Sequence, residues 1–414
     1  MRRPAAAVVA AALALTAAPS WGQAPEKIEG LPEDWYQNGW VYGRRAKLTV
    51  SNPSVHERRA EPVTLGVAQV KASCPDFNPD AFVIVDPAAA PDDPREYGGN
   101  DIPRQADDLN GDGEADEIAF QVELAPEETK ELLVYYRVSG NLPLDYTPHT
   151  FALFSQRYEG AGWESDLIAC RVYFDQRNAV DIFGKIRPRL SLSVFADPAH
   201  NFHEWSGAGM DVLMVRQSLG VGGFALWREG RMVKPASCVR SCRTIARGPV
   251  RAMVEIAYDN WRLNGQHCDA VARFTIWAHH RWTEQRVWVH GIGDFVAAAG
   301  IVKMDPEQTQ LLRGVGWVGT WGRQSDNNDN LGLGVVFPKS ADGRLTEDGL
   351  NHLLLMKGRE GQPVVWRIVA AWEKEAQPIT TAAGFEMLLR SIAGDFDIHP
   401  VVRIGSAESL PTTP

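Results

Sequence analysis

Short runs of alternating or β-branched residues occupy most of this chain, and they constrain its fold more than any other feature. Alternation of apolar and polar side chains is typical of a strand with one buried face. Gly, Pro, Asn and Asp residues separate the runs, as turns between strands require. We expect strands at 45–50, 63–70, 81–85, 118–122, 132–138, 250–258, 271–278, 285–290 and 331–337.

One segment near the end has a persuasive helical pattern, at residues 381–392. Its apolar residues recur at helical spacing, namely Ala382, Phe385, Leu388 and Leu389. Strands without intervening helices do not form the βαβ units of a parallel sheet. The chain is therefore predicted to be mainly β, with antiparallel sheets packed as sandwiches.

The Pro-containing segment NLPLDYTPHT at 141–150 separates small β units from a longer, tryptophan-rich part. At 414 residues, one large domain plus a smaller one is the expected organisation. We predict a signal peptide at 1–24, a small N-terminal β-sandwich at 25–145, a large β domain at 146–405 and a disordered polar tail at 406–414.

Residues 1–24 have the pattern of a cleavable secretory signal. Arg2 and Arg3 precede an apolar run at 5–18, and small residues at 22–24 suit a signal peptidase. The apolar run is too short for a membrane span, and no cysteine follows it closely enough for a lipid anchor. The mature chain is predicted to be periplasmic or secreted, without membrane contact.

The charge balance narrows the class of partner. The chain has 42 Lys and Arg against 52 Asp and Glu, a net charge of −10. An acidic chain is a poor partner for nucleic acid or an anionic membrane. It can still bind an anionic substrate, because a site is a local cluster of charge.

Five cysteines are an odd number for an exported protein. Cys238 and Cys242 are close enough in sequence to suggest a disulfide, and Cys268 could compete for either. Cys170 alternates with apolar residues and is predicted to be a buried free thiol.

The stretch WESDLIACRVYFDQRNAVDIFGK at 163–185 combines strand alternation with many charged residues. One face would hold Ile168, Cys170, Val172 and Phe174, and the other Arg171, Tyr173, Asp175 and Arg177. Further charged residues follow closely in sequence, namely Glu164, Asp166, Asp181 and Lys185. Such a face can bind an anionic or hydroxyl-rich ligand and move protons. The alternative is a solvated strand face with ordinary ion pairs.

A second candidate lies in a Gly-rich loop at 201–211. His203 stands beside Glu204 and Trp205, and an imidazole next to a carboxylate can act as an acid or base near neutral pH. The alternative is that His203 braces a surface loop. We expect it to meet Arg171, Arg177 and Tyr173 in one hollow.

Asp108, Asn110, Asp112 and Asp116 follow the oxygen spacing of a calcium loop, with Gly113 at the sixth position. Ala119 stands where an EF-hand has its bidentate Glu, and the flanks favour strands, so the pattern does not favour an EF-hand. A structural calcium ion in a β-type loop competes with a plain Asn/Asp/Gly turn. Nucleotide and serine-hydrolase motifs are absent from the sequence, so no cofactor is expected for catalysis.

Thirteen of the 14 tryptophans follow the predicted signal, and those beside glycines or polar turns could stack on sugar rings. Trp277 and Trp288 lie in strand patterns and are expected to be buried. His279 and His280 are adjacent on a strand and point to opposite faces, so we expect them to be structural and not to share one metal.

Three motifs resemble a group of exported bacterial proteins, the domain-of-unknown-function family 4861. They are the stretch at 163–185, HEWSGAGMDVLMVRQSLGVGGFALW at 203–227 and RGPVRAMVEIAYDNW at 247–261. The resemblance implies a polysaccharide-utilisation system acting on uronic-acid-rich glycans. The last motif is also similar to the galactose-mutarotase-like β-supersandwich of several glycan lyases and hydrolases, which implies that fold for the large domain.

These observations predict an exported carbohydrate-active protein that processes uronic-acid-containing plant or algal polysaccharide fragments. For β-elimination, His203 or Tyr173 would move the proton, and Arg171, Arg177 and Lys185 would bind the carboxylate. Trp163 and Trp205 would contact the sugar. A hydrolase would use two carboxylates drawn from Glu164, Asp166, Asp175, Asp181 and Glu204. A sugar mutarotase or epimerase and a non-catalytic glycan-binding protein remain alternatives.

Overall fold

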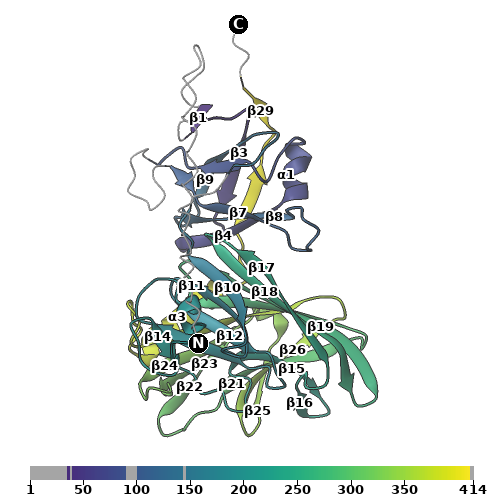
Figure 1. Cartoon of the computed structure of the whole chain (residues 1–414), viewed down its shortest axis with the longest axis vertical. Helices are drawn as coiled ribbons and strands as arrows, with labels where there is room; N and C mark the ends of the chain where they lie inside the picture. Colours follow the sequence, from purple (N-terminus) through teal and green to yellow (C-terminus); the bar gives the residue numbers. More distant parts are fainter. Residues whose placement is uncertain (1–34, 38–39, 90–99, 143–145, 411–414) are drawn as a thin grey trace, which may run out of the picture.

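The computed structural model describes residues 35–37, 40–89, 100–142 and 146–410 (Figure 1). The predicted signal peptide lies outside the described residues. Every strand ladder among the described residues is antiparallel. The prediction of a mainly β chain with antiparallel sheets is therefore confirmed.

The small domain packs two sheets around one apolar core that includes Leu48, Ile84, Phe120 and Val134. One sheet has the order β28-β3-β9-β5-β6, with β29 also paired to β3, and the other has the order β4-β8-β7. Their bounds are β3 Arg44–Ser51, β4 Arg58–Gly66, β5 Phe82–Val85, β6 Asp101–Ile102, β7 Arg104–Asp107, β8 Glu117–Leu124, β9 Thr129–Tyr136, β28 Val401–Ile404 and β29 Glu408–Ser409. A short separate pair joins β1 Tyr36–Gln37 and β2 Trp40–Val41.

The chain returns to the small domain at its C-terminal end, as the yellow strand in Figure 1 shows. Strand β28 pairs with β3 over Val401–Ile404, and β29 pairs with the start of β3. This pairing corrects two expected boundaries, because β28 belongs to the small sheet and 408–409 form a strand within the predicted disordered tail. Residues 411–414 lie outside the described residues.

The large domain contains three sheets. Their orders are β10-β11-β12-β13-β14, β16-β15-β21-β26-β25 and β17-β18-β19-β20-β27-β24-β23-β22. The first sheet has the bounds β10 Thr150–Ser155, β11 Gly160–Ser165, β12 Ala169–Tyr173, β13 Val180–Lys185 and β14 Gly209–Asp211. The second has β15 Val221–Arg228, β16 Arg231–Val233, β21 Phe295–Val302, β25 Arg344–Glu347 and β26 Asn351–Gly358. The third has β17 Val239–Arg247, β18 Arg251–Leu263, β19 Gln266–Trp277, β20 Trp282–His290, β22 Thr309–Gly314, β23 Trp317–Arg323, β24 Asn330–Val336 and β27 Val364–Trp372.

Alternation along β19 shows how the eight-stranded sheet separates a core from a polar face. Ala270, Ala272 and Phe274 point into the main core, which all three sheets share. Arg273 and Thr275, at alternate positions of the strand, face the other side, toward the small domain. The polar face of this sheet therefore becomes one wall of the cleft between the domains.

The described helices are short, with bounds α1 Val67–Ser73, α2 Leu192–Phe195, the 3-10 turn η2 Lys339–Ala341 and α3 Ala382–Asp395. None of them is long and apolar enough to cross a membrane. Helix α3 confirms the predicted helical pattern, and the Thr381 hydroxyl caps it by accepting a hydrogen bond from the Gly384 N–H at 3.1 Å. The expected strand at 63–70 ends at Gly66, and α1 begins with Val67.

All five cysteines are free, so the suggested disulfide does not form. Cys238 and Cys242 lie on or next to the extended strand β17. Four residues of extended chain span about 13 Å, which is too far for a disulfide. Cys170 is buried and free, as predicted.

Candidate functional site

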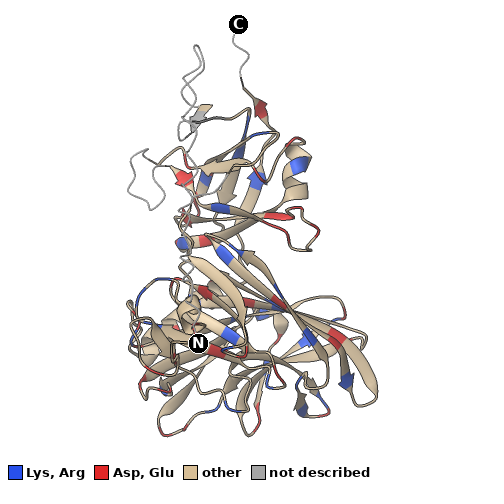
Figure 2. Cartoon of the chain, viewed as in Figure 1, with Lys and Arg blue, Asp and Glu red and all other residues tan. Residues whose placement is uncertain are grey.

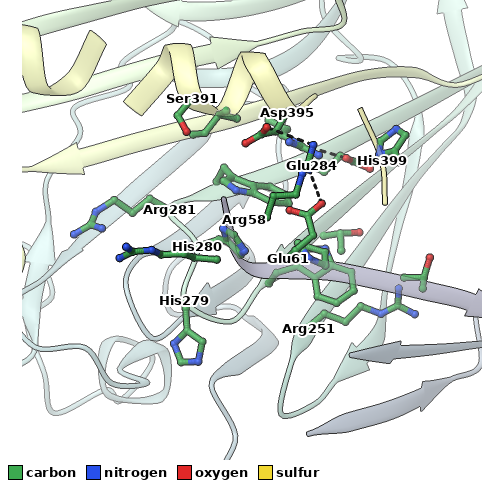
Figure 3. A pocket seen from close by; sticks show the side chains of 18 of the residues that line it. Arg58, Glu61, Arg251, His279, His280, Arg281, Glu284, Ser391, Asp395 and His399 are labelled. Carbon is green, nitrogen blue, oxygen red and sulfur yellow. Dashed lines mark hydrogen bonds and ion pairs between the residues drawn. The ribbon is translucent and has the colours of Figure 1, made fainter. Parts of the chain in front are cut away.

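A cavity of about 900 Å³ lies between the small domain and the polar face of the eight-stranded sheet. We call it the interdomain cleft. Figure 3 shows β4 of the small domain and the C-terminal half of α3 placing Glu61, Ser391 and Asp395 around it. Its volume falls in the range typical of small-molecule sites.

The cleft lining is rich in guanidinium groups. It includes Arg58, Arg59, Arg251, Arg273, Arg281, Arg286, Arg367 and Arg390. Five carboxylates accompany these eight arginines, namely Glu57, Glu61, Glu117, Glu284 and Asp395. The lining thus has eight guanidiniums against five carboxylates in a chain whose net charge is −10. Four further carboxylates that do not line the cleft pair with four of these arginines, namely Asp107, Glu255, Glu375 and Glu386. Charges of both signs are interleaved over both domains in Figure 2.

Some of these arginines are fixed by internal ion pairs, and others are open to solvent. The buried Arg58 guanidinium lies 2.8 Å from Glu61 and 3.4 Å from Asp395, so it ties β4 to α3. Arg286 lies 2.7 Å from Glu284, and its side chain is 49% exposed. Arg59 is 78% exposed and lies 2.9 Å from Glu57, so both of these exposed guanidiniums already have a carboxylate partner. A guanidinium has five N–H donors, so each of them retains donors for a ligand anion.

Indole rings lie beside the cleft arginines. Trp288 is half-buried in the cleft wall, with the Arg273 guanidinium carbon 5.5 Å from its ring centroid. Trp277 and Trp282 also line the cleft and are more deeply buried. Trp288 therefore offers an accessible aromatic surface next to positive charge.

Burial and charge together set the protonation of the cleft. Burial raises the pKa of Glu284, but Arg286 and Arg367 outweigh burial and hold that pKa below its usual value, so the carboxylate is ionised. Burial lowers the pKa of His280 to about 4, and its Nε2 lies 2.8 Å from the Ala60 carbonyl oxygen. Neutral His280 therefore donates to that oxygen and holds the small domain against the sheet.

The charged cluster predicted on β12 is present, but most of it is buried. Arg171 is 2% exposed, and its Nη2 lies 2.6 Å from Asp181 and 2.8 Å from Asp211. It also donates to the Tyr173 hydroxyl. Burial raises the pKa of Asp211 well above its usual range, with the nearby Asp181 adding to the shift. Arg171 is occupied by these internal partners and does not face solvent as a carboxylate-binding group would.

The structure brings Arg177 and His203 to the edge of this cluster. The Arg177 guanidinium carbon lies 3.6 Å from the Tyr173 ring centroid. The guanidinium nitrogen Nη2 pairs with Asp175 and Glu159. The His203 side chain is 58% exposed, with its Nδ1 3.5 Å from Asp211. The four predicted side chains are thus neighbours, with an imidazole at the surface and two carboxylates beneath.

The rest of the 201–211 loop lies at the surface. Glu204 is exposed and accepts a hydrogen bond from the Asn201 amide at 2.7 Å. Trp205 is 52% exposed, and its ring centroid lies 5.3 Å from that of the buried Trp372. Trp205 could therefore contact a ligand, as expected from the sequence.

Three predicted site residues are placed where a ligand does not reach them. Trp163 is fully buried, stacked on Phe274 at 4.4 Å between ring centroids. Lys185 and Glu164 form a fully buried ion pair of 2.7 Å. The Glu164 carboxylate also accepts hydrogen bonds from the backbone N–H groups at the start of α2. These expectations are corrected for two reasons. The chain around α2 covers Glu164 and its partner Lys185, and Trp163 lies on the opposite face of the sheet, in the main core.

The predicted calcium loop is folded around its own backbone. Asp108 accepts the N–H groups of Gly111 and Gly113 at 2.6 and 2.8 Å. Asn110 and Asp112 each accept the N–H two residues on, and Asp116 accepts the N–H of Leu109. A calcium ion here stays a prediction.

Sequence reasoning missed the cleft residues, although the signal was present. In β20 the core-facing residues are Thr283, Gln285, Val287 and Val289, while Trp282, Glu284, Arg286 and Trp288 line the cleft. The same kind of alternation predicts the two faces of β12. Trp288 was expected to be buried, but in the structure it is half-buried and lines the cleft.

Together, the fold and the cleft define a two-domain, all-antiparallel β protein with an arginine-rich, tryptophan-containing cavity between its domains. Over residues 50–401 the chain matches the family described as "Domain of unknown function (DUF4861)", and it belongs to that family. No match was found among curated proteins.

Two solved structures from Enterococcus faecalis are similar at low identity. One is a protein in the glycosyl hydrolase family 38, with 8% identity and a TM-score of 0.49, matched over 87% of this chain and 47% of that one. The other is an alpha-mannosidase, with 9% identity and a TM-score of 0.47, matched over 89% of this chain and 46% of that one. The chain spans about half the length of these proteins.

Proposed function

We propose that this protein binds oligosaccharides containing uronic acids in the interdomain cleft. The observation that supports this most is that eight arginines, among them Arg59 and Arg286 with exposed guanidiniums, line a cavity of about 900 Å³ in an acidic chain. Guanidinium groups form bidentate hydrogen bonds with carboxylates, which distinguishes an acidic sugar from a neutral one.

The tryptophans support a sugar over a simple organic acid. The accessible ring of Trp288 lies beside Arg273 and on the same cleft wall as Arg286. An indole face packs against the apolar face of a pyranose ring, while the exposed guanidinium of Arg286 binds the ring's carboxylate. A small acid such as acetate would interact with the arginines alone and would gain little from the tryptophan ring.

Calorimetric titration with galacturonate or glucuronate oligosaccharides tests this proposal, and the carboxyl-reduced oligosaccharide of equal length is the neutral comparison. Arg286→Ala should weaken binding of the acidic ligand about tenfold, equal to about 1.4 kcal/mol, and barely change binding of the neutral one. Trp288→Ala should weaken both. An equal loss on both ligands in Arg286→Ala would contradict the role of the carboxylate.

Arg359→Ala is a matched control, since Arg359 is exposed and does not line the cleft. It removes the same charge from the whole chain and should leave both affinities unchanged. If it weakens acidic binding as much as Arg286→Ala does, a general charge effect and not the cleft explains the result.

Turnover is the second part of the proposal: the protein processes such fragments, with β-elimination as the leading reaction. New ultraviolet absorbance from an unsaturated product would indicate elimination. New reducing ends without that absorbance would indicate hydrolysis, and exchange between the two anomers of a sugar would indicate a mutarotase. Binding without any of these would indicate a non-catalytic module.

His203 is the candidate base predicted from the sequence, and its exposed imidazole lies against the buried Asp211. It does not line the interdomain cleft, so turnover by His203 requires that the reacting sugar bind beside Tyr173 and Arg177 and not in the cleft. His203→Ala should abolish turnover and leave the fold intact, and wild-type turnover in this variant would remove His203 from the mechanism. The exported location is part of the same proposal, and N-terminal sequencing of the mature protein tests it.

A further inference from the structure

Two histidines and an aspartate meet at the junction of the two domains, outside the residues used above for sugar binding. His149, Asp166 and His279 each offer a donor atom, and these atoms lie within 4.8 Å of one another. His279 Nδ1 lies 2.9 Å from Asp166 Oδ2, and the two imidazole centroids are 4.6 Å apart.

Three separate chain segments fix these donors. His149 directly precedes β10, Asp166 lies in the turn after β11, and His279 lies in the turn between β19 and β20. The Ser165 hydroxyl donates to the His280 carbonyl at 2.8 Å, which ties the last two turns together. The donors therefore do not depend on one flexible loop.

The Asp166 carboxylate is oriented by the backbone. Its Oδ1 accepts the His279 N–H at 2.7 Å, and Asp166 is 6% exposed. Oδ2 is thereby turned toward the imidazole. His279 has a positive φ of 63°, a conformation that is uncommon for a residue with a side chain. Anchored ligands of this kind are typical of metal sites.

The donor set suits a borderline transition metal. Zinc prefers imidazole nitrogen and carboxylate oxygen at about 2.0–2.2 Å, which places donors about 3.3 Å apart in a tetrahedral site. The separation of 2.9 Å between His279 Nδ1 and Asp166 Oδ2 is already close to this. The distances to the third donor are at most 4.8 Å and would shorten on metal binding. Calcium and magnesium prefer oxygen donors and fit this set less well.

One side of the cluster is open. His149 and His279 line a second cavity of about 260 Å³ together with Asp86, Asp101 and Lys130, and His279 also borders the interdomain cleft. Three protein ligands with an open position is the arrangement of zinc sites that bind water or a ligand.

We infer that His149, Asp166 and His279 bind one Zn²⁺-type metal ion at the domain junction, with an open coordination position facing the second cavity. This metal site agrees with the expectation from the sequence that His279 and His280 do not share a metal. Figure 3 shows the His279 side chain directed away from that of His280. The second imidazole comes from His149, which is distant in sequence.

Zinc titration of the full, tag-free protein after treatment with a chelator tests the inference. We expect one Zn²⁺ per chain, and a Kd raised about 100-fold or more by His149→Ala, Asp166→Asn or His279→Ala. Asp166→Asn retains the shape and hydrogen-bonding capacity of the side chain, so it remains informative if a histidine variant fails to fold. Co²⁺ should give visible bands of a low-coordinate site in the wild type and lose them in the variants.

His290→Ala is the matched control, because His290 is an exposed histidine outside the cluster. It should bind zinc as the wild type does. Absence of tight zinc binding by the wild type would overturn the inference, and so would unchanged affinity in Asp166→Asn. This result does not depend on the glycan proposal, since the metal alone is the probe.

Discussion

Arg171 holds two buried carboxylates with one guanidinium, so its removal should damage the large domain more than it damages ligand binding. Arg171→Ala leaves Asp181 and Asp211 buried without their cation. Breaking a buried ion pair from one side costs about 3–5 kcal/mol of unfolding free energy. Urea denaturation measures this loss.

Arg177→Ala is the comparison for that experiment. Arg177 is partly exposed and pairs with the solvent-accessible carboxylates Glu159 and Asp175. Pairs of this kind contribute about 1 kcal/mol or less. Equal losses in the two variants would show that burial does not govern the contribution of Arg171.

Glu375 should make folding stability depend on pH. Burial raises its pKa to about 7, even though Arg281 donates to its carboxylate at 2.9 Å. An unfolded Glu ionises near pH 4.3, so between about pH 4.3 and 7 the folded chain keeps a proton that the unfolded chain has lost. The stabilisation from this group is full below that range and is lost as the pH rises to about 7.

Glu375→Gln cannot ionise, so its unfolding free energy should fall less than that of the wild type across the same pH range. Chemical denaturation at a series of pH values measures the difference. Glu307→Gln, at an exposed carboxylate, is the control and should follow the wild-type profile. Parallel profiles for wild type and Glu375→Gln would contradict the raised pKa.

At the scale of elements, α3 packs on β23 and β24 through glycines that allow a close approach. A Cβ atom at Gly332 would lie 2.6 Å from the Phe385 ring. Gly332→Ala should therefore overpack the contact and lower the unfolding free energy by about 1–3 kcal/mol. Thermal denaturation measures the loss.

Gly349→Ala is the control for α3, because nothing lies within 4 Å of a Cβ atom there. Its stability should stay at or slightly above that of the wild type. If both variants behave alike, the helix moves aside without cost and the close packing is not important.

Local patterns explain why so much of the element structure could be predicted. Alternation and helical spacing are properties of neighbouring residues, so β3, β18, β19 and α3 were found from the sequence. The segment from Val67 to Val70 continues the predicted strand, because two valines, an alanine and a glutamine suit either state. Its helical form is decided by packing, with Val67 and Val70 buried in the small core.

The site was predicted only in part, because burial is a property of the whole molecule. The neighbourhood of Arg171, Tyr173 and His203 was found from alternation and loop composition. The burial of Lys185 could not be predicted from alternation, because the segment that covers it comes later in the sequence. The cleft was missed because its walls come from both domains and from α3.

At the scale of the whole molecule, the returning C-terminal strand should control the cleft without lining it. His399 is the last residue of the cleft wall, and β28 directly follows and pairs with β3. Arg58 also donates to the Ile398 carbonyl at 2.8 Å. The wall between α3 and β28 is therefore held at both of its ends.

A chain truncated after His399 keeps every cleft residue but loses β28. Its affinity for acidic oligosaccharides should fall about tenfold, equal to about 1.4 kcal/mol, because the wall loses one anchor. Val402→Asp places a charge against the small core and should act in the same direction if the truncated chain is too unstable to purify. Removal of residues 411–414 alone should change nothing. Full affinity in the chain ending at His399 would mean that Arg58 and α3 hold the cleft wall without help from the small sheet.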